Sequence, residues 1–443
     1  MGGQALSTSI KSLIARRVWD SRGRPTVEAE VLLACGARGR AIAPAGASRG
    51  SHEAIDLRDG GGAFGGYGVT RAVANVNGEI AAALCRMDAR DQAGVDSALA
   101  ALDGTPNLSR LGGNATSAVS MAVLHAAASA SGDPLWRYLA AGAPVRLPLP
   151  EIQIFGGGAH AGRRIDIQDL MVMPLGARSF DEALEMVAEV YRTAGEIMAR
   201  RGPVSGVADE GGWWPDFASN EQALETLTHA IDLAGYKAPS EMAISLDIAA
   251  SELGSHGRYR LGLDGRELSR DEWLETLYGW VRRYPIISVE DPVGEDDAEG
   301  MRAFTAAVGG RIQVIGDDFL VTSAERVLRA SQTGDCNAVL LKPNQAGTVT
   351  QTRRALDAAR KAGWNTVVSA RSGESEDVTV VHLAVGWNAG QLKVGSFARS
   401  ERMAKWNEAL RIESELGTDA RFAGRDALMP GVMTPPLASG NLL

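Results

Sequence analysis

The second half of the chain repeats a short apolar run that ends on a charged or polar residue and is followed by a segment of helical periodicity. The runs are MAISLD, IISVED, IQVIGDD, NAVLLK, TVVSARS and GQLKVG, with end residues Asp247, Glu290, Asp317, Lys342, Ser369 and Lys393. From Glu290 onward these ends lie 27, 25, 27 and 24 residues apart. One strand, one helix and two loops fit this interval, so the rhythm predicts a β/α barrel. The longer interval of 43 residues after Asp247 predicts an extra hairpin or helix.

The first 140 residues follow a different pattern. TVEAEVLLA and RGRAIAPAG alternate in a strand-like way, whereas VTRAVANVNGEIAAALCRM and ATSAVSMAVLHAAASASG have helical character. Strands followed by helices favour a small α+β domain. The proline-rich stretch GAPVRLPLP is a suitable boundary. We therefore predict an N-terminal α+β domain over residues 1–140 and a β/α barrel over residues 146–443, since 443 residues exceed one simple core.

Composition narrows the class of protein. Hydrophobic residues make up 45% of the chain and charged residues 22%, and the net charge is −9. This balance fits a soluble globular protein and disfavours broad binding to nucleic acids or anionic membranes. Cys35, Cys85 and Cys336 are isolated and predict no disulfide framework. The N-terminus lacks a long apolar run, so we expect a cytoplasmic protein without a membrane partner.

Barrel enzymes carry their chemistry at the C-terminal ends of the strands, so the charged run ends should surround one pocket. Asp247, Glu290 and Asp317 offer hard oxygen ligands that suit magnesium. Salt bridges at the barrel rim are the alternative for each carboxylate taken singly. Lys342 and Lys393 favour chemistry, because a buried ammonium is costly unless it is paired or used. In a positive, partly desolvated site a lysine can have a lowered pKa and act as a base, while a metal stabilises the resulting dianion.

Two loops offer further candidates. Glu210 precedes a Gly-Gly turn in VADEGGWW and could protonate a leaving hydroxide as a general acid, although a solvent-exposed loop carboxylate is the simpler interpretation. His160 lies on the glycine-rich loop FGGGAHAGRR, where a lone histidine has many structural explanations. The glycines at 60–62 and 65–66 lack the preceding strand and following helix of a dinucleotide fingerprint.

Two more loops suit an anionic ligand. Arg371 and Ser372 in SARSG combine an arginine fork with an adjacent hydroxyl, which suits phosphate. Ser48 and Arg49 lie between glycines in PAGASRGSHEAIDLRDG. We interpret this loop as a mobile lid whose hydroxyl could help to ligate a metal, although an ordinary glycine-rich connection fits the sequence about equally well.

Segments along nearly the whole chain resemble those of enolases, in the same order. They are WDSRGRPTVEAEV, GASRGSHEAIDLRDG, DEGG, SLDIAASE, SVEDPV, GDDFLVTS, LLKPNQAGTVTQT, RSGESEDVTV and RSERMAKWNEALRIESELG. The resemblance implies an α/β protein with a small N-terminal α+β domain and a C-terminal enolase-type (β/α)8 barrel that starts irregularly and has one reversed strand. It also implies two magnesium ions per active site, a homodimer or larger assembly, and a small phosphorylated or phosphonylated three-carbon acid as substrate.

The resemblance further implies roles in metal and phosphate binding. The ligands of the first magnesium correspond to Asp247, Glu290 and Asp317. Ser48 matches the lid serine that ligates the second ion. Arg371 and Ser372 match the phosphate-binding pair.

Catalytic roles follow from the same resemblance. Lys342 matches the base that removes the proton from carbon-2, and Glu210 matches the acid that assists loss of the hydroxyl at carbon-3. Lys393 matches the lysine that faces the substrate carboxylate. His160 matches a histidine that enters the site from a loop. Together these roles imply a carbon-oxygen hydro-lyase.

The chain departs from the family at several positions near this site. Enolases have Ser-His-Arg-Ser-Gly where this chain has Ala370 in place of the histidine. They have Gln-Glu-Phe where this chain reads QDL at 168–170, so the glutamate is shortened by one methylene at Asp169. Arg49 replaces the usual threonine of the lid, and Trp213 and Trp214 replace a smaller pair.

These departures bear on the expected substrate. Ala370 opens space and removes a potential donor, while Arg49 supplies a charge that can pair with an anion, and both fall where the phosphate of 2-phosphoglycerate should sit. We therefore expect first a diverged paralogue that resembles carboxyphosphonoenolpyruvate synthase of phosphinothricin-type phosphonate antibiotic pathways, whose product carries an extra carboxylate on phosphorus. An ordinary glycolytic enolase is the alternative. A catalytically dead scaffold protein is a second alternative, which the retained lysines and metal ligands disfavour.

Overall fold

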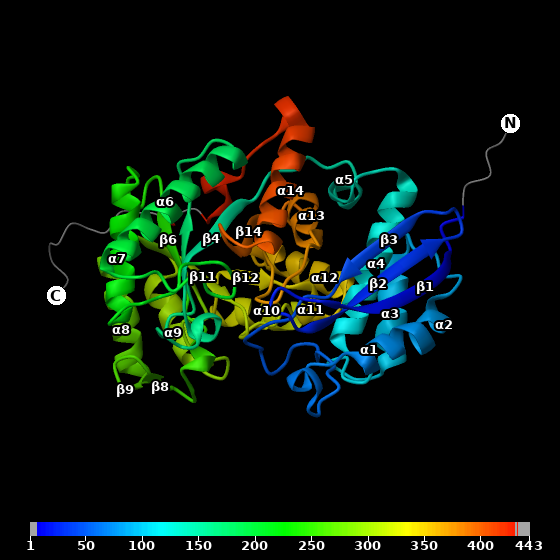
Figure 1. Cartoon of the computed structure of the whole chain (residues 1–443), viewed down its shortest axis with the longest axis horizontal. Coiled ribbons are helices and arrows are strands. Elements are labelled where there is room, and N and C mark those ends of the chain that lie inside the picture. The colour runs from blue at the N-terminus through cyan, green and yellow to red at the C-terminus, as the bar shows by residue number, and fades with distance from the viewer. Residues whose placement is uncertain (1–6, 430–431, 433–443) are drawn as a thin grey trace.

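The computed structural model describes residues 7–429 and residue 432, and it has two unequal parts (Figure 1). The smaller part, blue and cyan on the right of Figure 1, contains a three-stranded antiparallel sheet. Its strands are β1 (Ile10–Trp19), β2 (Pro25–Leu33) and β3 (Arg38–Ile42). The central strand β2 is buried along most of its length, whereas the edge strand β1 exposes most of its side chains. The strand predicted from TVEAEVLLA is confirmed.

The helices of this smaller domain follow the sheet in sequence. They are α1 (Thr70–Asn75), α2 (Ala81–Leu84), α3 (Gln92–Asp103), α4 (Gly113–Ser131) and α5 (Leu135–Ala140). Helix α4 is rich in alanine and serine and is almost completely buried against β2 and β3. A side chain at Gly39 of β3 would collide with the α4 backbone at Ala126, so the small residues permit the close packing. The predicted small α+β domain is confirmed.

The larger part is a closed eight-stranded barrel. Its strands are β4 (Leu149–Gly156), β5 (Asp169–Met173), β6 (Ala243–Asp247), β10 (Ile286–Glu290), β11 (Gln313–Gly316), β12 (Ala338–Leu341), β13 (Asn365–Ser369) and β14 (Gly390–Ser396). Strand β5 runs antiparallel to both β4 and β6, and all the other neighbours are parallel. The predicted barrel with an irregular start and one reversed strand is therefore confirmed.

Helices surround the barrel. They are α6 (Phe180–Arg201), α7 (Asn220–Leu233), α8 (Arg270–Arg283), α9 (Ala298–Val308), α10 (Ala324–Thr333), α11 (Pro343–Ala346), α12 (Val349–Lys361), α13 (Thr379–Gly386) and α14 (Ser400–Leu416). The long interval after β6 holds a small antiparallel sheet, β7 (Gly254–Ser255), β8 (Arg258–Leu261) and β9 (Arg266–Ser269), ahead of α8. This insertion is the extra element that the spacing predicted. Within the described residues, no helix is long and apolar enough to cross a membrane.

The two parts are joined where the smaller domain meets the start of α12. Three polar side chains of α3 and α4 bond to this segment. The Thr116 hydroxyl donates to the Gly347 carbonyl at 2.9 Å, and Ser120 Oγ accepts from the Val349 N–H at 2.9 Å. Asp96 accepts from the Thr350 N–H at 2.8 Å. Because the first N–H groups of a helix lack partners within the helix, these bonds stabilise the start of α12 from outside the barrel.

Candidate active site

The charged residues predicted from the strand ends meet at the C-terminal face of the barrel. Asp247 and Glu290 are the last residues of β6 and β10 and lie opposite each other in the parallel register. Asp317 and Lys342 directly follow β11 and β12, and Lys393 lies within β14. All five side chains are buried, with at most 8% of each residue exposed. The structure thus brings together the groups that the sequence rhythm selects.

Lys393 lies at the centre of an acidic network. Its Nζ donates to Asp247 Oδ2 at 2.9 Å and to Glu290 Oε2 at 2.7 Å, and it lies 3.7 Å from Asp169 Oδ2. Burial opposes the ammonium charge, but the carboxylates of Asp247 and Glu290 outweigh it and raise the pKa of Lys393 well above its usual range. Lys393 is therefore held as a positive charge between these carboxylates.

Lys342 is paired with a different carboxylate. Its Nζ donates to Asp317 Oδ2 at 2.5 Å, and Gln345 Nε2 donates to Asp317 Oδ1 at 3.1 Å. Burial disfavours the charged form, yet the adjacent Asp317 carboxylate raises the pKa of Lys342 above its usual value. The sequence-based expectation of a lowered pKa is wrong for this arrangement, because the nearest charge to the ammonium is negative.

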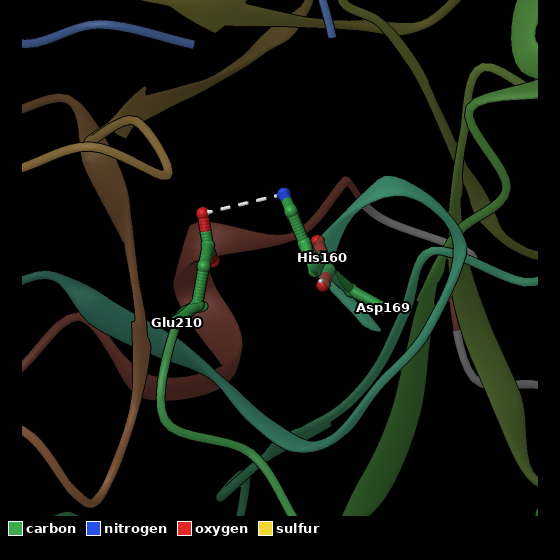
Figure 2. A group of neighbouring side chains, drawn as sticks. All are labelled: His160, Asp169 and Glu210. Atoms are coloured by element: carbon green, nitrogen blue, oxygen red, sulfur yellow. Dashed lines mark hydrogen bonds and ion pairs between the residues drawn. The ribbon is translucent and has the colours of Figure 1, made fainter. Parts of the chain in front are cut away.

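His160, Asp169 and Glu210 form a second buried group (Figure 2). His160 lies in the short turn after β4, Asp169 opens the reversed strand β5, and Glu210 comes from the loop after α6. The His160 Nδ1 lies 2.8 Å from Asp169 Oδ1, and the Nε2 lies 3.0 Å from Ser372 Oγ and 3.7 Å from Glu210 Oε1. Burial opposes protonation, but the Asp169 and Glu210 charges raise the pKa of His160 to about 9. The shortened acid Asp169 thus still reaches the histidine.

Glu210 is ionised in this arrangement. Burial raises its pKa, but the positive charges of His160 and Arg402 prevail and hold the pKa below its usual value. To protonate a leaving hydroxyl, Glu210 would first need to take up a proton. The nearest charged group on the histidine is Nε2 of His160, which lies 3.7 Å from Glu210 Oε1 and contacts Ser372 Oγ at 3.0 Å.

The two tryptophans after Glu210 pack behind its loop. Trp213 stacks on Tyr191 of α6 with ring centroids 4.8 Å apart, and its Nε1 donates to the Tyr191 carbonyl at 2.8 Å. The Tyr191 hydroxyl in turn donates to the Gly211 carbonyl at 2.9 Å. Trp214 approaches the loop that carries His160, near Gly162. Trp213 and Tyr191 therefore tie the Glu210 loop to helix α6.

Arg371 and Ser372 follow β13 and contact a loop that we call the lid and define as residues 43–58. The Arg371 Nη1 donates to Glu53 Oε2 at 3.0 Å, and its Nη2 donates to the Ser48 carbonyl at 3.1 Å. The Ala47 N–H donates to Ser372 Oγ at 3.2 Å. The backbone of the lid therefore lies directly on the predicted phosphate-binding pair.

Arg49 does not join Arg371 in this arrangement. Its guanidinium pairs with Asp56 of the lid, Nη2 to Oδ2 at 3.2 Å, and 39% of its side chain is exposed. Arg49 and Arg371 line a cavity of only about 10 Å³, which is room for roughly one water molecule. Ala370 is buried, and its N–H donates to the Lys393 carbonyl at 2.9 Å.

Sequence reasoning missed several residues that support the site. Asp291 is buried and accepts the N–H groups of Asp317 and Asp318 at 2.9 and 2.7 Å. Gln168 donates to Asp247 Oδ2 at 3.2 Å, and Glu53 holds Arg371. The adjacency of Asp291 to Glu290 in SVEDPV was a usable signal for the first of these. The other contacts join segments that are far apart in the sequence, so no local pattern predicts them.

The acidic residues suit a divalent cation. Glu290 Oε1 and Asp169 Oδ2 are buried atoms without a hydrogen-bond partner among the described residues. Oxygen atoms of Asp291, Asp317 and Asp318 lie within 4.8 Å of one another. Burial and the Asp317 charge raise the pKa of Asp318 to about 8. The ligands predicted for magnesium, Asp247, Glu290 and Asp317, are paired here with the two lysines, and a hard cation would be an alternative partner for these oxygens.

Comparison with known proteins places this geometry in a family. The family model described as "Enolase, N-terminal domain" matches residues 10–139, and the one described as "Enolase, C-terminal TIM barrel domain" matches residues 144–430. The chain is also 50% identical over 419 residues to a protein named "Enolase 1" from Desulfitobacterium hafniense (strain Y51), covering 94% of this chain and 96% of that relative. The chain belongs to the enolase family.

Proposed function

We propose that this protein is an ordinary enolase that dehydrates 2-phosphoglycerate to phosphoenolpyruvate. The observation that carries the proposal is the meeting of Lys342, Lys393 and Glu210 with the acidic strand ends on one buried face of the barrel. The 50% identity to a protein named as an enolase favours this function over the diverged paralogue that the departures first suggested. That first expectation is corrected accordingly, and the activity remains that of a hydro-lyase.

Magnesium is the expected cofactor, in keeping with general use in the enolase family. Asp247, Glu290 and Asp317 would hold one ion, and Ser48 of the lid is proposed to bind a second. When bound, the metal supplies Lewis-acid stabilisation of the doubly charged carboxylate that proton removal creates. The buried, unpartnered Glu290 Oε1 supports this assignment.

Lys342 is proposed to remove the proton from carbon-2 of the substrate. It must be neutral for this step, and its pairing with Asp317 opposes neutrality. A cation that bound the Asp317 carboxylate in place of Lys342 would remove the main cause of the raised pKa of Lys342 and so favour its neutral amine. Lys393, tied to two carboxylates, keeps its charge and suits the role of facing the substrate carboxylate.

Loss of the carbon-3 hydroxyl is assigned to Glu210 with His160 as its partner. Glu210 would deliver the proton to the leaving oxygen after taking one up, and the His160 imidazolium, whose Nε2 lies 3.7 Å from Glu210 Oε1, stabilises the carboxylate that remains. Asp169 keeps the imidazole oriented through Nδ1, and Ser372 contacts its other nitrogen. Arg371 remains the proposed phosphate ligand, since its buried guanidinium lies next to Ser372 and is held beside the lid by Glu53.

The carboxyphosphono analogue of 2-phosphoglycerate is the compound against which this proposal is tested, because the chain has Ala370 where enolases have a histidine. Ala370 is buried, with 6% of the residue exposed. We expect Ala370→His to shift preference toward 2-phosphoglycerate if the analogue is the natural substrate. The deciding experiment is turnover of both compounds side by side with magnesium. Turnover of neither would favour the dead scaffold.

The assembly and the location of the protein are also proposals. We expect a homodimer or larger homo-oligomer in the cytoplasm. The edge strand β1 exposes Ile14 and Trp19, which are 47% and 50% accessible and could pack against another subunit. Sedimentation velocity at micromolar concentration checks the assembly, and a monomer at all concentrations would refute it.

A further inference from the structure

The chemistry proposed above gives no role to Glu53, the acidic partner in a buried ion pair of the lid. Glu53 Oε2 and Arg371 Nη1 lie 3.0 Å apart, and only 7% and 4% of their side chains are exposed. We propose that Glu53 is a positioning residue: its carboxylate, which the lid brings to Arg371, fixes the guanidinium in the orientation that the substrate phosphate needs. The inference rests on the proposed phosphate role of Arg371.

The contacts of Arg371 show how its orientation is set. The Nη1 donates to both Glu53 and Asn344 Oδ1, the latter at 3.2 Å, and the Nη2 donates to the Ser48 carbonyl at 3.1 Å. Two of these three acceptors belong to the lid and one follows β12. A guanidinium is planar and binds phosphate through a fork of fixed geometry, so its orientation determines whether the fork meets the ligand. Glu53 is the only charged acceptor of the three.

Glu53 can reach Arg371 only when the backbone of the lid packs against the Arg371 side chain. A side chain at Gly46 would collide with the guanidinium, which shows how closely the two segments approach. The Ala45 and Gly373 backbones bond to each other, and Ser372 Oγ accepts from the Ala47 N–H. Opening the lid would therefore break the ion pair and leave Arg371 without its charged partner.

Two roles of Glu53 predict opposite results. A carboxylate that orients Arg371 should strengthen phosphate binding, because the fork is held ready before the ligand arrives. A carboxylate that only competes with phosphate for the same guanidinium should weaken it. Substitution of Glu53 therefore separates positioning from competition by the sign of the change in affinity.

The test compares wild type, Glu53→Gln and Glu295→Gln by calorimetric titration with inorganic phosphate in the presence of magnesium. Glu295 is a matched control, since it also accepts from the lid, at the Ser51 N–H, without contacting Arg371. We expect Glu53→Gln to raise the phosphate Kd about tenfold, the scale of one charge-assisted hydrogen bond, and Glu295→Gln to leave it within threefold. An unchanged or lower Kd in Glu53→Gln would overturn the proposal.

Two further readouts separate positioning from a general loss of structure. Phosphate should protect the wild-type lid from trypsin cleavage at the exposed Arg49 and should fail to protect Glu53→Gln. The KM for 2-phosphoglycerate should rise about tenfold in this variant, with kcat changed less than threefold. If Glu53→Gln does not fold, Gly46→Ala crowds the same guanidinium, and the Ser48 carbonyl beside it, without removing a charge, and it should weaken phosphate binding. Titration and protection need no turnover, so they remain valid if 2-phosphoglycerate is not the substrate.

Discussion

The barrel rim and the lid bring chemical groups to the same site by different means. At the rim, register fixes each group: Glu290 lies opposite Asp247, and Lys393 lies opposite Ser369. On the lid, position depends on a few contacts such as Glu53 with Arg371, and Arg49 is substantially exposed. We therefore propose that the rim determines which reaction occurs, whereas the lid adjusts how tightly the ligand is held. Substitutions at the rim should therefore have much larger effects than those on the lid.

The largest effect is expected for the base at the rim. Lys342→Ala should lower kcat about 10²- to 10⁴-fold, the usual contribution of a positioned general base. Steady-state kinetics with 2-phosphoglycerate measure this loss. Lys361→Ala removes an exposed lysine at the end of α12 and should leave kcat unchanged. Activity of Lys342→Ala within tenfold of wild type would show that the rim lysine is not the base.

Metal binding at the rim should give the next largest effect. Adding magnesium to chelator-treated protein should raise the free energy of unfolding by about 3 kcal/mol at a hundredfold excess over Kd, because the ion binds the folded chain. Glu290→Gln should abolish most of this gain, since it removes a buried ligand oxygen. Glu299→Gln, on an exposed carboxylate, is the matched control. Equal magnesium stabilisation in both variants would contradict the assignment of the metal ligands.

The rim was predictable from the sequence and the lid contacts were not. Strand ends in a parallel barrel meet at one face, so the spacing from Glu290 to Lys393 sufficed to bring the charges together. Glu53 and Arg371 are 318 residues apart and meet only through the tertiary fold. Arg49 was expected to face the substrate, but Asp56, seven residues later, is its partner. The local sequence cannot show whether the Arg49 side chain pairs with a neighbouring carboxylate or with a ligand.

A third region, the junction between the smaller domain and the barrel, should respond to pH. His125 of α4 and His382 of α13 lie with ring centroids 6.4 Å apart, and the buried environment lowers the pKa of His382 to about 4. The unfolded chain would protonate His382 near pH 6.5 while the folded chain does not, so stability should fall from pH 6.5 toward pH 4. The loss attributable to His382 is on the order of 3 kcal/mol at pH 4. Denaturant titrations of wild type and His382→Gln at several pH values check this prediction. If the free energy of unfolding falls equally in both proteins from pH 6.5 to pH 4, His382 is not the cause.

The smallest effect is expected at the exposed end of the lid. Arg49→Thr removes an ion pair with Asp56 that is open to solvent, and such pairs contribute about 0–1 kcal/mol. Its kcat/KM should therefore change less than about fivefold for 2-phosphoglycerate and for the carboxyphosphono analogue alike. If Arg49→Thr lowered kcat/KM for the analogue but not for 2-phosphoglycerate, the original expectation that Arg49 binds an extra carboxylate would be restored. Competition kinetics with both compounds give the ratio directly.

The central claim is that separate residues of the rim and its loops remove the proton and the hydroxyl. The most direct test is exchange of the carbon-2 hydrogen of 2-phosphoglycerate with solvent deuterium in wild type, Lys342→Ala and Glu210→Gln, with magnesium present. We expect exchange to disappear in Lys342→Ala and to persist in Glu210→Gln while product formation slows, because the two events belong to different groups. Exchange that persists in Lys342→Ala, or that is lost equally in both variants, would contradict the claim.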